Sequence, residues 1–73
     1  MHYIYVLRRE MGWYIGYTSD LVRRLTEHKK KYICKLIYYE AYGSEVVARQ
    51  REMKLKQYGS AWRGLRKRIE GGV

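Results

Sequence analysis

The chain has 73 residues, a single cysteine and a formal net charge of +9, from 16 Lys and Arg against 7 Asp and Glu. A chain this short packs one hydrophobic core, so we expect a single domain over residues 1–73. The lone Cys34 excludes a disulfide within the chain and a thiolate-rich zinc site. No apolar run approaches the roughly 20 residues of a membrane span, and we expect a soluble, cytoplasmic protein without a membrane partner.

The basic excess predicts a polyanionic partner, because a strong positive field on a small surface attracts nucleic acid. Nine Tyr and two Trp residues add aromatic faces on which unpaired bases can stack. The same rings can instead fill a small core, and composition leaves both uses open.

Two strands are predicted at the start of the chain, over residues 2–8 and 13–18. Both segments are rich in β-branched and aromatic side chains. The segment from Arg9 to Gly12 is short and ends in glycine, which suits a hairpin loop that needs a positive φ near its end. The two strands should therefore pair antiparallel.

A helix is predicted after the hairpin, with Ser19 as its N-cap and Asp20 in its first turn. We expect this helix to end near Lys30. The compact apolar and aromatic run within residues 34–41 then predicts a third strand, which Gly43 ends.

Two more helices are predicted in the last third of the chain. Ser44 can cap the first of them, which continues to Gln57 and stops at Gly59. Ser60 can cap the second, which we expect to end near Ile69, with a frayed tail over residues 70–73. The expected fold is α+β, in the order β-β-α-β-α-α.

Polar side chains border the predicted apolar face of each of the first two helices. On a helical wheel Leu21, Val22 and Leu25 share one arc of the first helix, and Arg24 and His28 lie four residues apart along its edge. The arc of the second helix consists of Val47, Ala48, Leu55 and Tyr58.

Glu52 falls beside the arc of the second helix, and Arg51 lies near its other side. A carboxylate close to a core needs a partner, and either an arginine or a metal ion would serve. A surface ion pair with Lys56 or Arg49 is the simpler alternative. We expect Glu27 and Glu40 to be surface residues.

Five motifs occur in order along the chain, each on an expected element. They are Tyr3-Ile4-Tyr5, Tyr14-Ile15-Gly16, the string from Asp20 to His28, the third-strand string from Leu36 to Glu40, and the helical string from Ala48 to Lys56. In this combination the sequence resembles the GIY-YIG nucleases over nearly its whole length.

The resemblance implies a three-stranded antiparallel sheet flanked by helices, with a nuclease site that uses one Mg²⁺ or Mn²⁺. It implies Glu52 as the metal ligand and Arg24 as the cation on the scissile phosphate. Either Tyr5 or Tyr14 would activate or orient the attacking water, and His28 would assist proton transfer or contact the phosphate. The small Gly16 would allow a close backbone approach.

The function expected from this resemblance is divalent-metal-dependent endonuclease activity that hydrolyses phosphodiester bonds in DNA, with selectivity for DNA structure. RNA stays open as a substrate, and a homodimer or a protein partner is an open source of specificity. The alternative is a non-catalytic DNA- or RNA-binding module with the same fold. The short segment 29–33 between His28 and the third strand favours that alternative. As ordinary strand aromatics, Tyr5 and Tyr14 would have no catalytic role.

Overall fold

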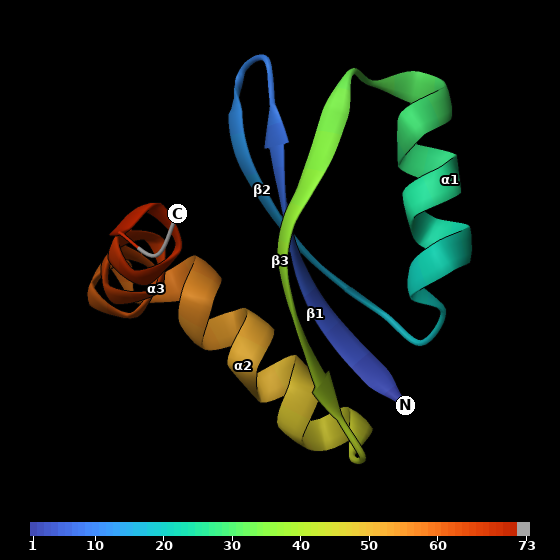
Figure 1. Cartoon of the computed structure of the whole chain (residues 1–73). Coiled ribbons are helices and arrows are strands. Elements are labelled where there is room, and N and C mark those ends of the chain that lie inside the picture. Colours follow the sequence, from blue (N-terminus) through green and yellow to red (C-terminus); the bar gives the residue numbers. More distant parts are fainter. Residues whose placement is uncertain (72–73) are drawn as a thin grey trace.

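The computed structural model describes residues 1–71 as a three-stranded antiparallel sheet with helices on both faces (Figure 1). The elements are β1 (His2–Arg9), β2 (Gly12–Thr18), α1 (Leu21–Lys31), β3 (Cys34–Tyr42), α2 (Glu45–Gln57) and α3 (Gly59–Gly71). The strand order is β2-β1-β3. α1 lies on one side of the sheet, and α2 packs on the other side with α3 against it. The predicted α+β class and element order are confirmed.

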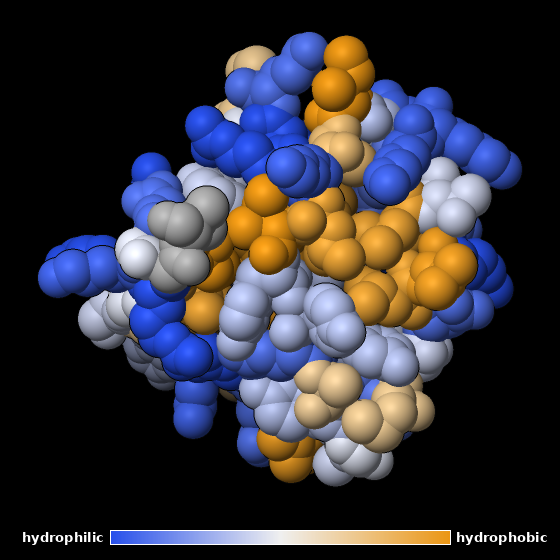
Figure 2. Space-filling model, in the orientation of Figure 1, coloured by the Kyte–Doolittle hydropathy of each residue, from blue (hydrophilic) through white to orange (hydrophobic). Residues whose placement is uncertain are grey.

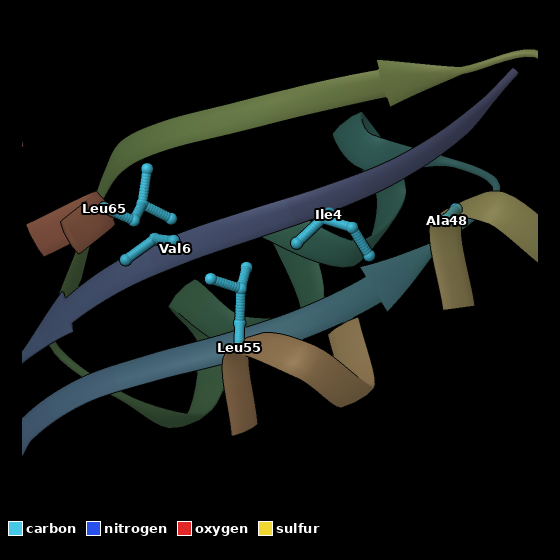
Figure 3. Packing of buried hydrophobic residues seen from close by; sticks show 5 residues of the cluster. All are labelled: Ile4, Val6, Ala48, Leu55 and Leu65. Atoms are coloured by element: carbon cyan, nitrogen blue, oxygen red, sulfur yellow. The ribbon is translucent and has the colours of Figure 1, made fainter. Parts of the chain in front are cut away.

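The central strand β1 is the most buried element, because it is paired along both edges and covered on both faces. Four consecutive residues of β1 have no exposed surface: Ile4, Tyr5, Val6 and Leu7. The main core lies between the sheet and α2 and α3, and its buried members are Ile4, Val6, Ala48, Leu55 and Leu65 (Figure 3). Side chains alternate along a strand, so Tyr5 and Leu7 point to the opposite face, beneath α1.

The β1–β2 hairpin closes as its sequence predicts. Arg9 pairs with Gly12 at the end of the ladder, which leaves Glu10 and Met11 as the two turn residues. Gly12 has a φ of 131°, a value that residues with a Cβ rarely adopt. The glycine in the predicted loop is therefore required by the turn.

The N-cap of α1 differs from the prediction. The side chain of Asp20, and not that of Ser19, accepts a hydrogen bond from the Arg23 N–H at 3.1 Å. The hydroxyl of Thr18 accepts one from the Asp20 N–H at 3.0 Å, and this bond holds the cap in place. The predicted cap of α2 is confirmed, since Ser44 accepts from the Val47 N–H.

The junction between α2 and α3 is tighter than predicted. Tyr58 is the C-cap of α2, and Gly59 is the first residue of α3 and not a separate stop before a cap at Ser60. Helix α3 continues to Gly71, two residues beyond the expected end, so the expected frayed tail loses residues 70 and 71 to the helix. The rest of that prediction, residues 72–73, lies outside the described residues.

Three residues assigned to apolar helix faces are exposed, namely Val22 (76%), Val47 (45%) and Tyr58 (58%). On α1 the half-buried positions include Leu21, Leu25 and His28, so the face that meets the sheet is centred near Leu25. Val22 lies about 100° around the helix from Leu21, so its side chain points away from the face that meets the sheet. On α2 the buried stripe is narrower than predicted and contains Ala48 and Leu55.

Glu40 is an internal ion-pair partner, which corrects its assignment to the surface. Its carboxylate accepts hydrogen bonds from the Arg51 guanidinium at 3.0 and 3.1 Å and from the hydroxyls of Tyr38 and Tyr42. Burial alone would raise the pKa of Glu40, but these four donors lower it below its ordinary value. β3 and α2 are thereby joined by a charged hydrogen-bond network.

The surface is mixed in polarity. Figure 2 shows apolar side chains gathered over β3 and α1, with hydrophilic side chains around them. Within residues 1–71, no helix combines the length and the apolar character needed to cross a membrane.

Candidate active site

Tyr5 and His28 are in direct contact between the sheet and α1. The Tyr5 hydroxyl oxygen and His28 Nε2 are hydrogen-bonded at 2.9 Å, and the two rings meet edge to face with centroids 5.6 Å apart. Tyr5 has no exposed surface. His28 reaches this ring because it lies on the face of α1 that packs on the sheet.

Tyr14 is the second motif tyrosine on this face, and its position differs from that of Tyr5. Its ring centroid lies 6.1 Å from that of Tyr5 and 5.0 Å from that of His28. Tyr14 is only half-buried and lines the clefts on both sides of it. Of the two tyrosines, Tyr14 is therefore the one that a bound molecule can touch.

Arg24 lies one turn before His28 on α1, with its side chain about half exposed (49%). Its guanidinium is 3.4 Å from the Glu27 carboxylate, an exposed pair on the same helix. Exposed pairs of this kind contribute about 0 to 1 kcal/mol. The guanidinium can therefore exchange Glu27 for a phosphate at little cost.

Glu52 reaches the same region from α2, around the outer edge of β2. Its carboxylate lines a cleft of about 400 Å³ together with Tyr14, Thr18, Ser19 and Arg24. Lys56 Nζ lies 3.2 Å from Glu52 Oε2 and 6.0 Å from the Tyr14 ring centroid. The alternative pairing of Glu52 with Lys56 is thus present, whereas Arg49 pairs with Glu45.

Two clefts meet at a common wall made by Tyr14 and Arg24, since both side chains line both clefts. Glu52 lies in the cleft beside α2, and His28 lies in a second cleft of about 350 Å³ beside the hairpin. The structure thus brings four of the five predicted site residues to one surface. Tyr5 is the exception, because it lies behind that surface.

The environment of this site separates the roles available to Tyr5 and His28. Burial, and then the neighbouring Tyr14, raise the pKa of Tyr5 to about 12, against the opposing effect of Arg24. A phenol with this pKa stays protonated at neutral pH. Burial, followed by Arg24 and Arg9, lowers the pKa of His28 below its ordinary value of 6.5. His28 is therefore neutral at physiological pH and can accept a proton.

The donor set around Glu52 suits a cation that shares its coordination with a substrate. Within residues 1–71, no three His, Cys, Asp or Glu side chains cluster as a metal-binding group, and Glu52 is the one acidic residue among those that line the cleft beside α2. Mg²⁺ is commonly held by one or two carboxylates together with waters and substrate phosphates. A single carboxylate that opens into a cleft fits this mode, provided that the cation displaces Lys56.

The sequence indicated Lys56 only as an ion-pair partner of Glu52, one helical turn away, and it did not single out two further residues at this surface. Arg9 and Tyr32 line the second cleft together with His28. They come from the hairpin and from the end of α1, and no local pattern connects them.

Comparisons with known proteins find similarity over most of the chain. A family model described as the GIY-YIG catalytic domain matches residues 1–68. A UPF0213 protein from Halobacterium salinarum is 35% identical over 71 residues, covering 84% of this chain and 92% of the relative. A UPF0213 protein from Haloquadratum walsbyi is 31% identical over 67 residues, covering 78% and 75%.

A solved structure is also similar to this fold. The solution NMR structure of a UPF0213 protein from Bacillus halodurans aligns with a TM-score of 0.55 and 31% identity, covering 75% of this chain and 69% of that one.

Proposed function

Because the chain belongs to the GIY-YIG catalytic domain family, we propose that it is a divalent-metal-dependent endonuclease that hydrolyses phosphodiester bonds in DNA. The observation that carries the proposal is the wall of Tyr14 and Arg24, with the Glu52 carboxylate in the cleft on one side and the His28 imidazole in the cleft on the other. A phosphate placed against this wall would meet a cation, a carboxylate and a neutral base.

Arg24 would bind the non-bridging oxygens of the scissile phosphate. Hydrolysis gathers negative charge on these oxygens, and a guanidinium presents two parallel N–H donors to them. The half-exposed position of Arg24 and its weak pairing with Glu27 leave it available for this contact.

Glu52 would hold the Mg²⁺ or Mn²⁺ ion in the cleft beside α2. When bound, the ion would supply positive charge that offsets the negative charge developing during hydrolysis. The Lys56 ammonium, 3.2 Å from Glu52, would move toward the DNA backbone and add a further cation there.

Tyr14 would orient the attacking water, because it is the tyrosine that lines the clefts. His28 would take the proton from this water at Nδ1, directly or through Tyr14, in the tautomer whose Nε2–H donates to the Tyr5 hydroxyl oxygen. Burial and the neighbouring arginines keep the imidazole neutral for this role. Tyr5 would act as a positioning residue, since its hydroxyl fixes the His28 ring at 2.9 Å.

The substrate would be recognised through its backbone and shape. Phosphate contacts position a protein on nucleic acid without reading bases, and the described residues form one small domain surface rich in Lys and Arg. We propose DNA as the substrate, with RNA as the alternative, and a homodimer or a partner protein as a further source of specificity.

One observation favours a second function, that of a non-catalytic nucleic-acid-binding module. Glu52 is paired with Lys56, and among residues 1–71 no three His, Cys, Asp or Glu side chains cluster to hold a metal ion. If the metal cannot displace Lys56, the surface would still bind phosphates without cleaving the chain.

Incubation of the purified protein with labelled duplex, single-stranded and branched DNA, and with RNA, tests these two functions. Each substrate is supplied with Mg²⁺, with Mn²⁺ or with chelator. Cleavage that requires the metal supports the endonuclease. Binding of every substrate without cleavage in either metal supports the binding module.

A further inference from the structure

The second cleft has features that the hydrolytic reaction does not use. Its lining residues come from the β1–β2 hairpin and from the C-terminal part of α1 and the residue after it. The hairpin turn and the C-terminal end of α1 both lie at the top of the view in Figure 1. Four cations line it, Arg9, Arg24, Lys30 and Lys31, against the single acid Glu27. This balance makes the cleft a site for an anion.

Arg9 is held in the cleft between two aromatic rings. Its guanidinium carbon lies 3.9 Å from the ring centroid of Tyr32 and 5.1 Å from that of Tyr14. A stacked guanidinium contacts the rings through its flat faces, so that its N–H donors point outward in its plane. Among residues 1–71 no carboxylate forms an ion pair with Arg9. Its donors are therefore oriented and free for a phosphate.

Tyr32 supplies an aromatic surface next to this cation. It lies in the short connection between α1 and β3, and 46% of its surface is exposed. Arg9 lies over one face of its ring, and the centroid of the His28 ring is 6.5 Å from that of Tyr32. The exposed part of Tyr32 is available to a second flat group. Bases stack on such rings irrespective of sequence, and within a duplex the faces of a base are already covered by its neighbours.

This cleft is continuous with the proposed catalytic site, because Tyr14 and Arg24 belong to both. A DNA strand with its scissile phosphate on Arg24 would place an adjacent nucleotide beside Arg9 and Tyr32. We propose that this cleft binds one unpaired nucleotide next to the scissile phosphate, with its phosphate on Arg9 and its base stacked on Tyr32. The inference rests on the proposed function, and it gives the substrate class as DNA with an unpaired segment at the cleavage site.

A binding experiment without metal tests this inference separately from catalysis. In chelator, affinity is measured for a blunt duplex and for the same duplex with a single-stranded overhang, which carries at the junction a fluorescent base analogue whose emission falls on stacking. The wild type should bind the overhang substrate more tightly and quench the analogue. Tyr32→Leu should remove the quenching and weaken overhang binding by about 5- to 150-fold, the range for loss of one base–aromatic stack.

Two further variants guard against indirect effects on folding. Tyr58→Leu is the matched control, because Tyr58 is likewise an exposed C-cap residue, on α2, and it does not line the cleft. Its preference for the overhang should equal that of the wild type. Tyr32→Trp keeps an aromatic face and should retain the preference and the quenching.

Arg9→Gln tests the phosphate contact and should reduce the salt dependence of binding by about one counterion. An unchanged salt dependence in Arg9→Gln, or equal overhang preference in Tyr32→Leu and Tyr58→Leu, would overturn the inference. No step of this experiment requires cleavage. A protein that prefers the overhang through Tyr32 but never cuts would therefore support the nucleotide-binding cleft and contradict the endonuclease proposal. Metal-dependent cleavage, together with overhang binding that does not depend on Tyr32, would support the endonuclease proposal and contradict the nucleotide-binding cleft.

Discussion

The ring of Tyr5 lies against the backbone of Gly16, its pairing partner on β2. A Cβ on Gly16 would come within 2.5 Å of both Cζ and the hydroxyl oxygen of Tyr5, and within 2.9 Å of Cε1 of Tyr14. The close approach expected at Gly16 is therefore made by the tyrosine whose hydroxyl holds His28.

We expect Gly16→Ala to lower the free energy of unfolding by about 1 to 3 kcal/mol, because a buried ring must shift to admit the methyl group. Cleavage should fall with it, since the shift moves the Tyr5 hydroxyl away from His28. Chemical denaturation measures the first effect. Gly64→Ala is the control, because a Cβ there meets no atom within 4 Å and should raise stability by up to about 1 kcal/mol in helix α3. Equal stability of the two variants would contradict the packing argument.

Removing the hydroxyls of the two tyrosines should have unequal effects. Tyr14→Phe should stay as stable as the wild type and lose cleavage activity by about 10² to 10⁴, as expected for a group that acts on the attacking water. Tyr5→Phe should lose about 1 to 2 kcal/mol of stability, because it leaves the partly buried His28 nitrogen without its partner, and should lose less activity. Both effects are measured by denaturation and single-turnover cleavage. If both Phe variants cut at the wild-type rate, neither tyrosine hydroxyl has a role in the reaction.

Glu52→Gln and Arg24→Ala should separate catalysis from binding. Glu52→Gln removes a negative charge beside the anionic substrate, so binding should stay equal or tighten while metal-supported cleavage is lost. Arg24→Ala should lower the rate by about 10³ or more and the affinity by about 1 kcal/mol. Glu70→Gln, which breaks a similar helical ion pair with Arg66, is the control for removal of a carboxylate. A wild type that binds but never cuts, with Glu52→Gln indistinguishable from it in every metal, would establish the binding module.

The cleavage rate should rise with pH through the pKa of His28. Burial and the adjacent arginines place this pKa below 6.5, so His28 is protonated only in acid, and the rate should reach its plateau by neutral pH. The same shift makes the folded state less stable as the pH falls below 6.5, because the unfolded chain binds the proton more strongly. Rates are measured between about pH 5 and 8. In His28→Ala, the fall in rate on the acid side of this profile should be absent. If the rate of that variant falls at acidic pH as it does in the wild type, another group is responsible for the titration.

Glu40→Gln should destabilise the fold by about 2 to 4 kcal/mol, because it leaves the partly buried Arg51 without its charge partner. The pKa of Glu40 is lowered in the folded protein, so its contribution is complete above its ordinary value of 4.5 and is lost as the pH falls through the lower folded pKa. Denaturation at several pH values should therefore show a weaker acid dependence in the variant. Glu45→Gln, at an exposed pair with Arg49, should change stability by less than about 0.5 kcal/mol.

The sequence by itself determined the elements and the turn chemistry. Strand composition identified β1 and β2, Gly12 specified the hairpin, and Ser44 marked the start of α2. These signals depend on interactions between near neighbours in the chain, so they can be read without the fold. The motifs likewise indicated the family, because their order and spacing are properties of the sequence.

Only the tertiary structure decided which side chains are accessible and which are paired. Tyr5 and Tyr14 have similar motif contexts, but Tyr5 lies on the central strand beneath α1 and is buried, whereas Tyr14 is on the edge strand and faces the clefts. Glu40 is partly buried because it forms an ion pair with Arg51, which lies on a different element, α2. Arg9 and Tyr32 meet because the hairpin and the end of α1 lie side by side. Burial and long-range pairing depend on how the layers pack, which the local pattern of residues does not contain.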